Sequence, residues 1–195
     1  VFNIFQRINT GGLALNDQEI RQALYNGKST ELIKELASAK EFLTATQYAI
    51  KKERMIDREY VTRFIAFTEL DYKKEYKGNI DNYLIKAMKK VNNYSESELE
   101  RIRMDFKCIM RYCRLIFGRF AFRKYNAERR GPINKAIFEM WSAVFSKLEN
   151  HELQILVDNR KEFLEKFREL QNNKEFVVAL KAGDQYSMAK RMSMA

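Results

Sequence analysis

The chain has 195 residues, and its 36 Lys and Arg against 26 Asp and Glu give a formal net charge of +10. Hydrophobic residues make up 46%, which argues against disorder, while 7 glycines and one proline are too few for the turns of an all-β sandwich. The composition predicts an all-α protein, an irregular multi-helix array forming one continuous domain. The positive charge would attract polyanions such as nucleic acid, although it also serves solubility alone.

The sequence offers few residues for metal or redox chemistry. Cys108 and Cys113 are five residues apart, a spacing that points their thiols in different directions on a helix, so we expect no disulfide and a reducing, cytoplasmic location. Because His151 is the single histidine, we expect no zinc site and no Ser-His-Asp or Cys-His catalysis. No apolar run approaches the roughly 18 residues of a membrane span, so no membrane partner is expected.

The hydrophobic pattern of the first half predicts a series of helices. Apolar residues at positions 1, 4, 5 and 8 mark one helical face that is under way at the first residue, Val1, so we expect a fragment of a longer chain. Asn16 and Glu19 have the spacing of a capping box, and Gly27 is expected to close the helix that they open. Further helices are expected over 29–36, over 42–48, behind an acidic cap at Asp57, and over 80–91.

The second half begins with the clearest helical pattern of the chain. Ser95 and Glu98 form a second capping box, and apolar residues then alternate at intervals of three and four as far as Ile116. This pattern makes Cys113 a core residue. Beyond this helix we expect Pro132 in the first turn of another helix, a single helix over about 152–170, and a frayed C-terminal segment over 187–195.

A glycine-containing corner is the first candidate anion site. Gly11 and Gly12 permit backbone conformations forbidden to other residues and the close approach of a ligand, and the helix that follows presents free amides at its N-terminus. Arg7 and Arg21 would then face a phosphate. An ordinary turn between two helices is an equally good interpretation.

A basic and aromatic segment is the second candidate. Residues 119–125 read Arg-Phe-Ala-Phe-Arg-Lys-Tyr, with two further arginines close behind, a mixture that can hold phosphates while its rings stack or pack. In the alternative interpretation, Phe120 and Phe122 anchor a loop to the core while the cations are solvated. The residues expected to contact nucleic acid are Arg119, Arg123, Lys124, Arg129 and Arg130.

The N-terminal pattern resembles a known protein family. A stretch of twenty residues is similar to the second signature of domain-of-unknown-function family 262, the N-terminal-domain family of GmrSD-like, modification-dependent restriction enzymes of bacteria. The stretch reads Phe5-x-Arg7-Ile8-Asn9-Thr10-Gly11-Gly12-x-x-Leu15-x-x-Gln18-Glu19-Ile20-Arg21-x-Ala23-Leu24. The stretch Asn134-Lys135-Ala136-Ile137-Phe138-Glu139 is also similar to a recurring family sequence. The remainder resembles the family only as a helical array.

The resemblance implies a larger ParB-like α/β protein whose Asp-Gly-Gln-Gln-Arg motif lies upstream and is linked to nucleotide hydrolysis or DNA cleavage. It implies a nucleoside triphosphate and Mg²⁺ as cofactors, with Arg7 as a phosphate clamp and Asn9 as a phosphate or metal contact. The phosphate-binding residues expected on this basis are Arg7, Asn9, Gly11, Gly12, Gln18 and Arg21.

We therefore expect two parts, a signature helix-loop-helix over residues 1–27 and a helical domain over 28–195, continuous with each other. The implied function is that of the helical part of a nucleotide-dependent, modification-sensing DNA restriction protein, inactive alone because most of its site lies upstream. A non-catalytic DNA-binding module and a purely structural interaction domain are the alternatives.

Overall fold

The computed structural model describes residues 14–124 and 130–195, and the all-α prediction is confirmed for them. Between those bounds, the strand-like pairing is limited to an isolated antiparallel bridge between Arg123 and Ile133. The expected first helix lies outside the described residues. The helices are α2 (Asp17–Leu24), α3 (Lys28–Ala37), α4 (Lys40–Thr46), α5 (Ile56–Glu69), α6 (Tyr72–Glu75), α7 (Ile80–Val91), α8 (Glu96–Phe117), α9 (Lys135–Phe145), α10 (Asn150–Asp158), α11 (Arg160–Asn172), α12 (Lys174–Ala179) and α13 (Gln185–Met194), with short 3-10 turns η1 (Glu53–Met55) and η2 (Gly118–Phe120).

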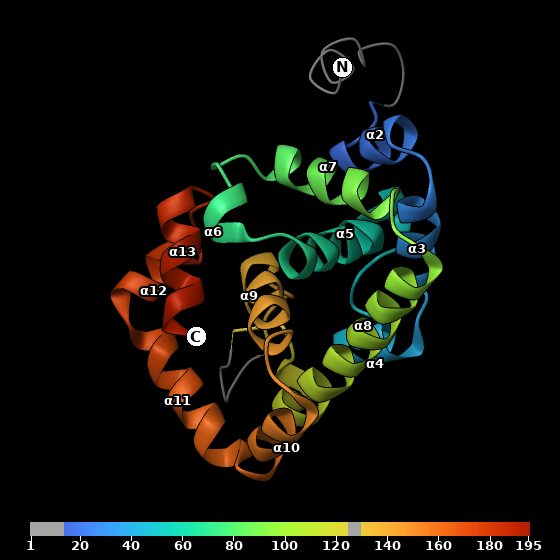
Figure 1. Ribbon diagram of the computed structural model, residues 1–195. Coiled ribbons are helices and arrows are strands. Elements are labelled where there is room, and N and C mark those ends of the chain that lie inside the picture. Colours follow the sequence, from blue (N-terminus) through green and yellow to red (C-terminus); the bar gives the residue numbers. More distant parts are fainter. Residues whose placement is uncertain (1–13, 125–129) are drawn as a thin grey trace.

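The helices are arranged around a central pair, α5 and α9 (Figure 1). Helix α5 packs against α3, α7 and α9, while the long helix α8 packs against α4, α10 and α11. The C-terminal helices α11 to α13 pass along the opposite side, and α13 returns to contact α9 (Figure 1). This return brings residues near the end of the chain next to its centre. No helix in the described part combines the length and apolar character of a membrane span.

Both predicted capping boxes are confirmed. The Asn16 side chain accepts from the Glu19 amide at 2.9 Å, and the Glu19 carboxylate accepts from the Asn16 amide at 2.7 Å. Ser95 and Glu98 make the same reciprocal contacts at the start of α8. These motifs are local, because a side chain satisfies an otherwise unpaired amide three residues away, and local sequence therefore predicts them well.

Two other expected helix starts are wrong by a few residues. Pro132 precedes α9, and Asn134 caps that helix by accepting from the Ile137 amide at 3.1 Å. Asp57 lies in the first turn of α5, whose N-cap residue is Met55. Proline and aspartate are both common near the start of a helix, but in these two places neither residue marks the position of the N-cap.

The C-terminal part departs further from its sequence-based prediction. The single helix expected over about 152–170 is two helices that meet at Asn159. The segment expected to fray is the ordered helix α13, capped by Asp184 and carrying buried Met188 and Met192. Burial against neighbouring helices, which a local pattern does not reveal, is what orders this end of the chain.

An aromatic cluster joins the long helix to the central and C-terminal helices. The ring of Trp141 lies 5.1 Å from that of Phe117 on α8, 5.3 Å from Phe145 on its own helix and 5.1 Å from Phe167 on α11. Trp141 is 2% exposed. Rings of this size bury large apolar areas, so the cluster holds α8, α9 and α11 in register.

Candidate functional site

The structure describes only part of the predicted phosphate site. Its residues outside the described ranges are Arg7, Asn9, Gly11 and Gly12, and Arg129 of the basic segment is outside them as well. The chain enters the described structure at Ala14, just before α2. Gln18 and Arg21 on that helix are the two members of the predicted phosphate site whose surroundings are defined.

Gln18 and Arg21 are interior residues of the helical array. They are 2% and 1% exposed, respectively. The Arg21 Nε donates to the Gln18 Oε1 at 3.1 Å, and the Gln18 Nε2 donates to the Thr62 hydroxyl of α5 at the same distance. A second Arg21 nitrogen contacts the Asp81 carboxylate of α7 at 2.5 Å. Burial lowers the pKa of Arg21, and the carboxylate of Asp81 opposes that effect. These contacts attach α2 to α5 and α7, so both side chains serve as internal anchors.

The loop between α4 and α5, residues 47–55, holds the start of α2. Arg54 donates to the Glu19 carboxylate at 2.8–3.1 Å and to the Ala14 carbonyl at 2.5 Å. In return, the Asn16 side-chain amide donates to the Arg54 carbonyl at 2.6 Å. The hydrogen bond from Arg54 lowers the pKa of Glu19. Charged and backbone groups of this loop therefore fix the point at which the signature enters the helical array.

Both ends of this α4–α5 loop contain left-handed residues that are not glycine. Gln47 and Tyr48 have φ values of 54° and 56°, and Arg54 and Met55 have values of 56° and 57°. The left-handed region costs a residue with a Cβ roughly 1–2 kcal/mol. Such conformations persist only where surrounding contacts impose them, and they concentrate at functional sites.

The basic segment, residues 119–130, combines a buried arginine with exposed cations. Arg123 is 3% exposed, and it donates to the Gly131 carbonyl at 2.5 Å and to the Thr46 carbonyl at 3.4 Å. Burial lowers the pKa of Arg123, and the charge of Arg130 lowers it further. Arg123 is thus a structural residue that ties the basic segment to the end of α4. In contrast, Lys124 and Arg130 are exposed.

The aromatic residues of this segment are packed in the interior. Phe120 is 8% exposed and Phe122 is 1% exposed, as the packing alternative predicts. The Phe122 ring lies 4.7 Å from that of Phe138 on α9. Because both rings are used in the core, the exposed side chains among the described residues of the segment are those of Arg119, Lys124 and Arg130.

The α4–α5 loop contacts both candidate regions. Arg130 donates to the Gln47 side chain at one end of the loop, and Arg54 donates to Glu19 of α2 at the other end. Lys51 and Lys52 are exposed between them. We call the surface formed by residues 47–55, Lys124 and Arg130 the basic face.

A buried charge cluster lies between the central helices and the C-terminus. Glu139 of α9 accepts from Arg63 of α5 and, at 2.7 Å, from Arg191 of α13. Arg63 also contacts Glu59 at 2.7 Å, and the Lys135 Nζ lies 2.9 Å from the same carboxylate. Burial by itself would lower the pKa of Arg63, but the two carboxylates outweigh it and raise that pKa. Glu59 and Arg63 are four residues apart on α5, but the tertiary fold brings the other members to them, so local spacing does not predict the cluster.

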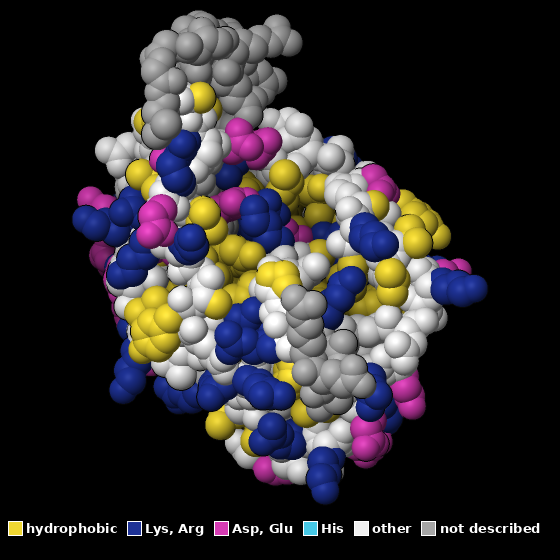
Figure 2. All heavy atoms as spheres, turned by 180° about the vertical axis from the view of Figure 1, so that it is seen from behind, with side chains coloured by type: hydrophobic (Ala, Val, Ile, Leu, Met, Phe, Trp, Pro, Cys, Tyr) yellow, Lys and Arg dark blue, Asp and Glu magenta, His cyan; other side chains and the backbone are white. Residues whose placement is uncertain are grey.

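A cavity of about 330 Å³ opens beside this cluster, lined by Arg63, Tyr76, Glu139, Gly183 and Arg191 among others. The Tyr76 hydroxyl donates to the Gly183 carbonyl. A hollow in which cationic and anionic side chains lie beside hydrophobic ones is visible in Figure 2. Its charged side chains are paired with one another, so the arrangement is suited to joining α5, α9 and α13.

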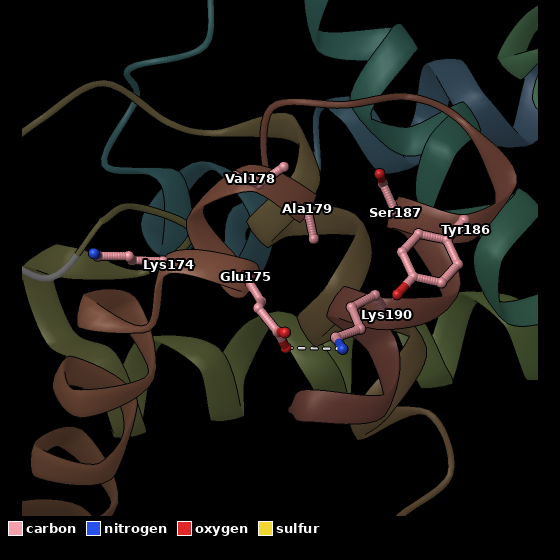
Figure 3. A pocket seen from close by; sticks show the side chains of 7 residues that line it. All are labelled: Lys174, Glu175, Val178, Ala179, Tyr186, Ser187 and Lys190. Atoms are coloured by element: carbon pink, nitrogen blue, oxygen red, sulfur yellow. Dashed lines mark ion pairs between the residues drawn. The ribbon is translucent and has the colours of Figure 1, made fainter.

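A second depression lies between α12 and α13 and measures about 280 Å³ (Figure 3). Lys190 and Glu175 form an ion pair of 2.8 Å across it, beside exposed Tyr186 and Val178. The side chains shown in Figure 3 offer an ion pair, two hydroxyls and small apolar surfaces, with no partner positioned to activate a nucleophile.

Metal-ligating side chains do not converge in the described ranges. No group of three or more His, Cys, Asp or Glu residues there is arranged to hold a metal ion. His151 is exposed at the start of α10 and lies 3.3 Å from Glu149, and Cys108 and Cys113 are free. Comparisons of the sequence with protein-family models and curated proteins, and of the fold with solved structures, find no match.

Proposed function

We propose that this chain is the helical part of a bacterial, nucleotide-dependent and modification-sensing DNA restriction protein. In this proposal Arg7 clamps a phosphate of a nucleoside triphosphate, Asn9 contacts phosphate or Mg²⁺, and Gly11 and Gly12 allow the ligand to approach the backbone. An Asp-Gly-Gln-Gln-Arg motif upstream completes the site. In this proposal Gln18 and Arg21, which are buried against α5 and α7, position the signature and do not contact the phosphate themselves.

The observation that carries the proposal is the attachment of the signature to the basic face. Arg54 contacts both the Ala14 carbonyl and the capping residue Glu19, while Arg130 contacts Gln47 of the same α4–α5 loop. A nucleotide bound by the signature and a duplex held by the basic face would therefore act on connected parts of one helical array. In this proposal the DNA contacts come from Arg119, Lys124, Arg129 and Arg130, with Lys51 and Lys52 added, while Arg123 positions the segment.

Nucleotide titration tests the first half of the proposal. We expect Arg7→Ala and Asn9→Ala each to weaken the binding of Mg²⁺-ATP or Mg²⁺-GTP to the intact protein and to reduce its hydrolysis. Arg168→Ala is the matched control, because Arg168 is an exposed arginine on α11. Affinity and hydrolysis that stay at the wild-type values in both signature variants would refute the nucleotide role.

The salt dependence of DNA binding tests the second half. Each phosphate contact contributes about 0.9 to the slope of log affinity against log salt concentration for duplex DNA. The double variant Lys124→Ala/Arg130→Ala should therefore lower that slope by about 2, whereas Lys161→Ala/Arg168→Ala on α11 should leave it unchanged. DNA binding without a nucleotide effect would favour the non-catalytic DNA-binding module. A protein with neither activity would favour the structural interaction domain.

A further inference from the structure

We infer that Tyr48, at the start of the α4–α5 loop, is a stacking platform for an unpaired nucleobase of the bound nucleic acid. This inference rests on the proposed function, because it assigns one contact within the basic face. It adds a substrate class to that function, namely single-stranded nucleic acid or a base displaced from a duplex.

Tyr48 follows the C-cap residue of α4 and is largely exposed. Its side chain is 70% exposed, although it belongs to a residue type that is ordinarily at least half buried. Tyr48 and the preceding Gln47 are both left-handed. The Tyr48 amide donates to the Leu43 carbonyl at 2.9 Å, so this conformation is fixed against the end of α4. Gln47 is left-handed as the C-cap residue of α4, a common way for a helix to end. The left-handed Tyr48 that follows is a second unfavourable residue, and its ring is mostly exposed.

Cations lie near Tyr48 in the basic face. Arg130 contacts the side chain of Gln47, the residue before Tyr48. Lys51 and Lys52 follow within four residues, which limits their Cα atoms to about 15 Å from that of Tyr48. Glu53 is the exposed acidic residue of the same loop, so the cations outnumber it. Aromatic side chains near cations are the combination with which proteins hold a nucleic-acid backbone and stack on its bases.

The chemistry favours an unpaired base over an intact duplex. A tyrosine ring can stack only on the open face of a base, and the bases of a continuous duplex present their faces to each other. Stacking does not depend on the base identity, because every base has a flat aromatic face. The proposed contact therefore adds affinity for single strands without adding sequence preference.

The test uses fluorescence anisotropy of a labelled single-stranded oligonucleotide of about 20 nucleotides, and of the matching blunt duplex, with the full chain. We expect Tyr48→Ala to weaken single-strand binding about tenfold with an unchanged salt slope. Tyr48→Phe should bind as the wild type does, because the ring is retained and the backbone strain is similar. Tyr186→Ala is the matched control, because that tyrosine is 74% exposed on α13.

A second readout detects stacking directly. An oligonucleotide containing 2-aminopurine should be quenched by the wild type and by Tyr48→Phe, and less by Tyr48→Ala. The stacking role would be overturned if Tyr48→Ala kept the wild-type affinity and quenching while Lys124→Ala/Arg130→Ala bound the oligonucleotides more weakly. DNA binding by the basic face would then still stand. If the wild type binds neither oligonucleotide, the DNA-binding part of the proposed function fails together with this inference.

Discussion

Replacement of Glu139 by alanine tests whether the buried charge cluster joins the central helices to α13. The side chain of Glu139 is 4% exposed, and its two oxygens accept from Arg63 and Arg191, whose side chains are 12% and 3% exposed. Removing one partner of a buried ion pair costs about 3–5 kcal/mol, because the remaining charge stays desolvated. Arg63 keeps Glu59, and Arg191 keeps two backbone carbonyls at 3.1 Å, so we expect a loss within this range and not beyond it.

Urea unfolding followed by tryptophan fluorescence measures this loss. Trp141 is the single tryptophan and is 2% exposed, so its emission reports on the core between α8, α9 and α11. A loss of about 3–5 kcal/mol would also lower Tm by on the order of 10 °C for a chain of this length. Glu162→Ala removes an exposed ion pair to Lys166 and serves as the control with no measurable change expected.

The reasoning would be refuted if Glu139→Ala changed the free energy of unfolding by less than about 1 kcal/mol, the typical size of a surface effect. A compensating variant sharpens the comparison. In Glu139→Ala/Arg191→Met both charges are gone from the contact between α9 and α13, and an apolar side chain fills part of the space. We expect the double variant to be more stable than Glu139→Ala alone, since an unpaired buried charge is the main cost.

Three further predictions concern Gly27, Glu59 and Cys113. Gly27→Ala places a Cβ 2.7 Å from the Asn92 Oδ1 at a φ of +153°, so urea titration should show a loss of about 1–3 kcal/mol, and an unchanged midpoint would contradict it. Burial raises the pKa of Glu59, but Arg63 and other cations outweigh burial and lower that pKa from 4.5. The ionised carboxylate therefore stabilises the fold above pH 4.5, and this stabilisation is lost as the pH falls through the lowered pKa. Glu59→Gln should make stability depend less on pH in the acid range, and an unchanged pH dependence would show that Glu59 is not its source. Burial also raises the pKa of the Cys113 thiol, so a thiol reagent should modify Cys113 only as fast as the chain unfolds. Rapid labelling of Cys113 itself in the native protein, resolved from that of the partly exposed Cys108, would disprove its burial.

The sequence predicts those features that are encoded within a few residues. The capping boxes at Asn16 and Ser95 were found because their partners lie three residues away. The break at Asn159 was missed because the helical pattern continues across it. Helix α13 was missed for a different reason, since its order depends on contacts such as that of Arg191 with Glu139, which is 52 residues away.

The basic segment shows the same limit within a single motif. Arg123 and Arg130 look equivalent as cations beside aromatic residues. The fold buries the first against backbone carbonyls of residues 46 and 131 and leaves the second exposed against Gln47. Residue type and spacing locate a basic segment, but only tertiary packing separates the arginine that positions it from the one available to an anion.

Tertiary packing also changes the interpretation of the two stretches that resemble the family, because several of their residues are structural. In the N-terminal signature, Gln18 and Arg21 form buried contacts to α5 and α7. In the second similar stretch, Asn134 caps α9 and Glu139 joins three helices. These four residues hold the helices together, so mutating any of them would lower the stability of the fold. Ligand binding would then fall even if the residue does not touch the ligand. A loss of activity in Arg21→Ala would therefore not identify a phosphate ligand, whereas a loss in Lys124→Ala/Arg130→Ala, with unfolding unchanged, would identify a contact made by the basic face itself.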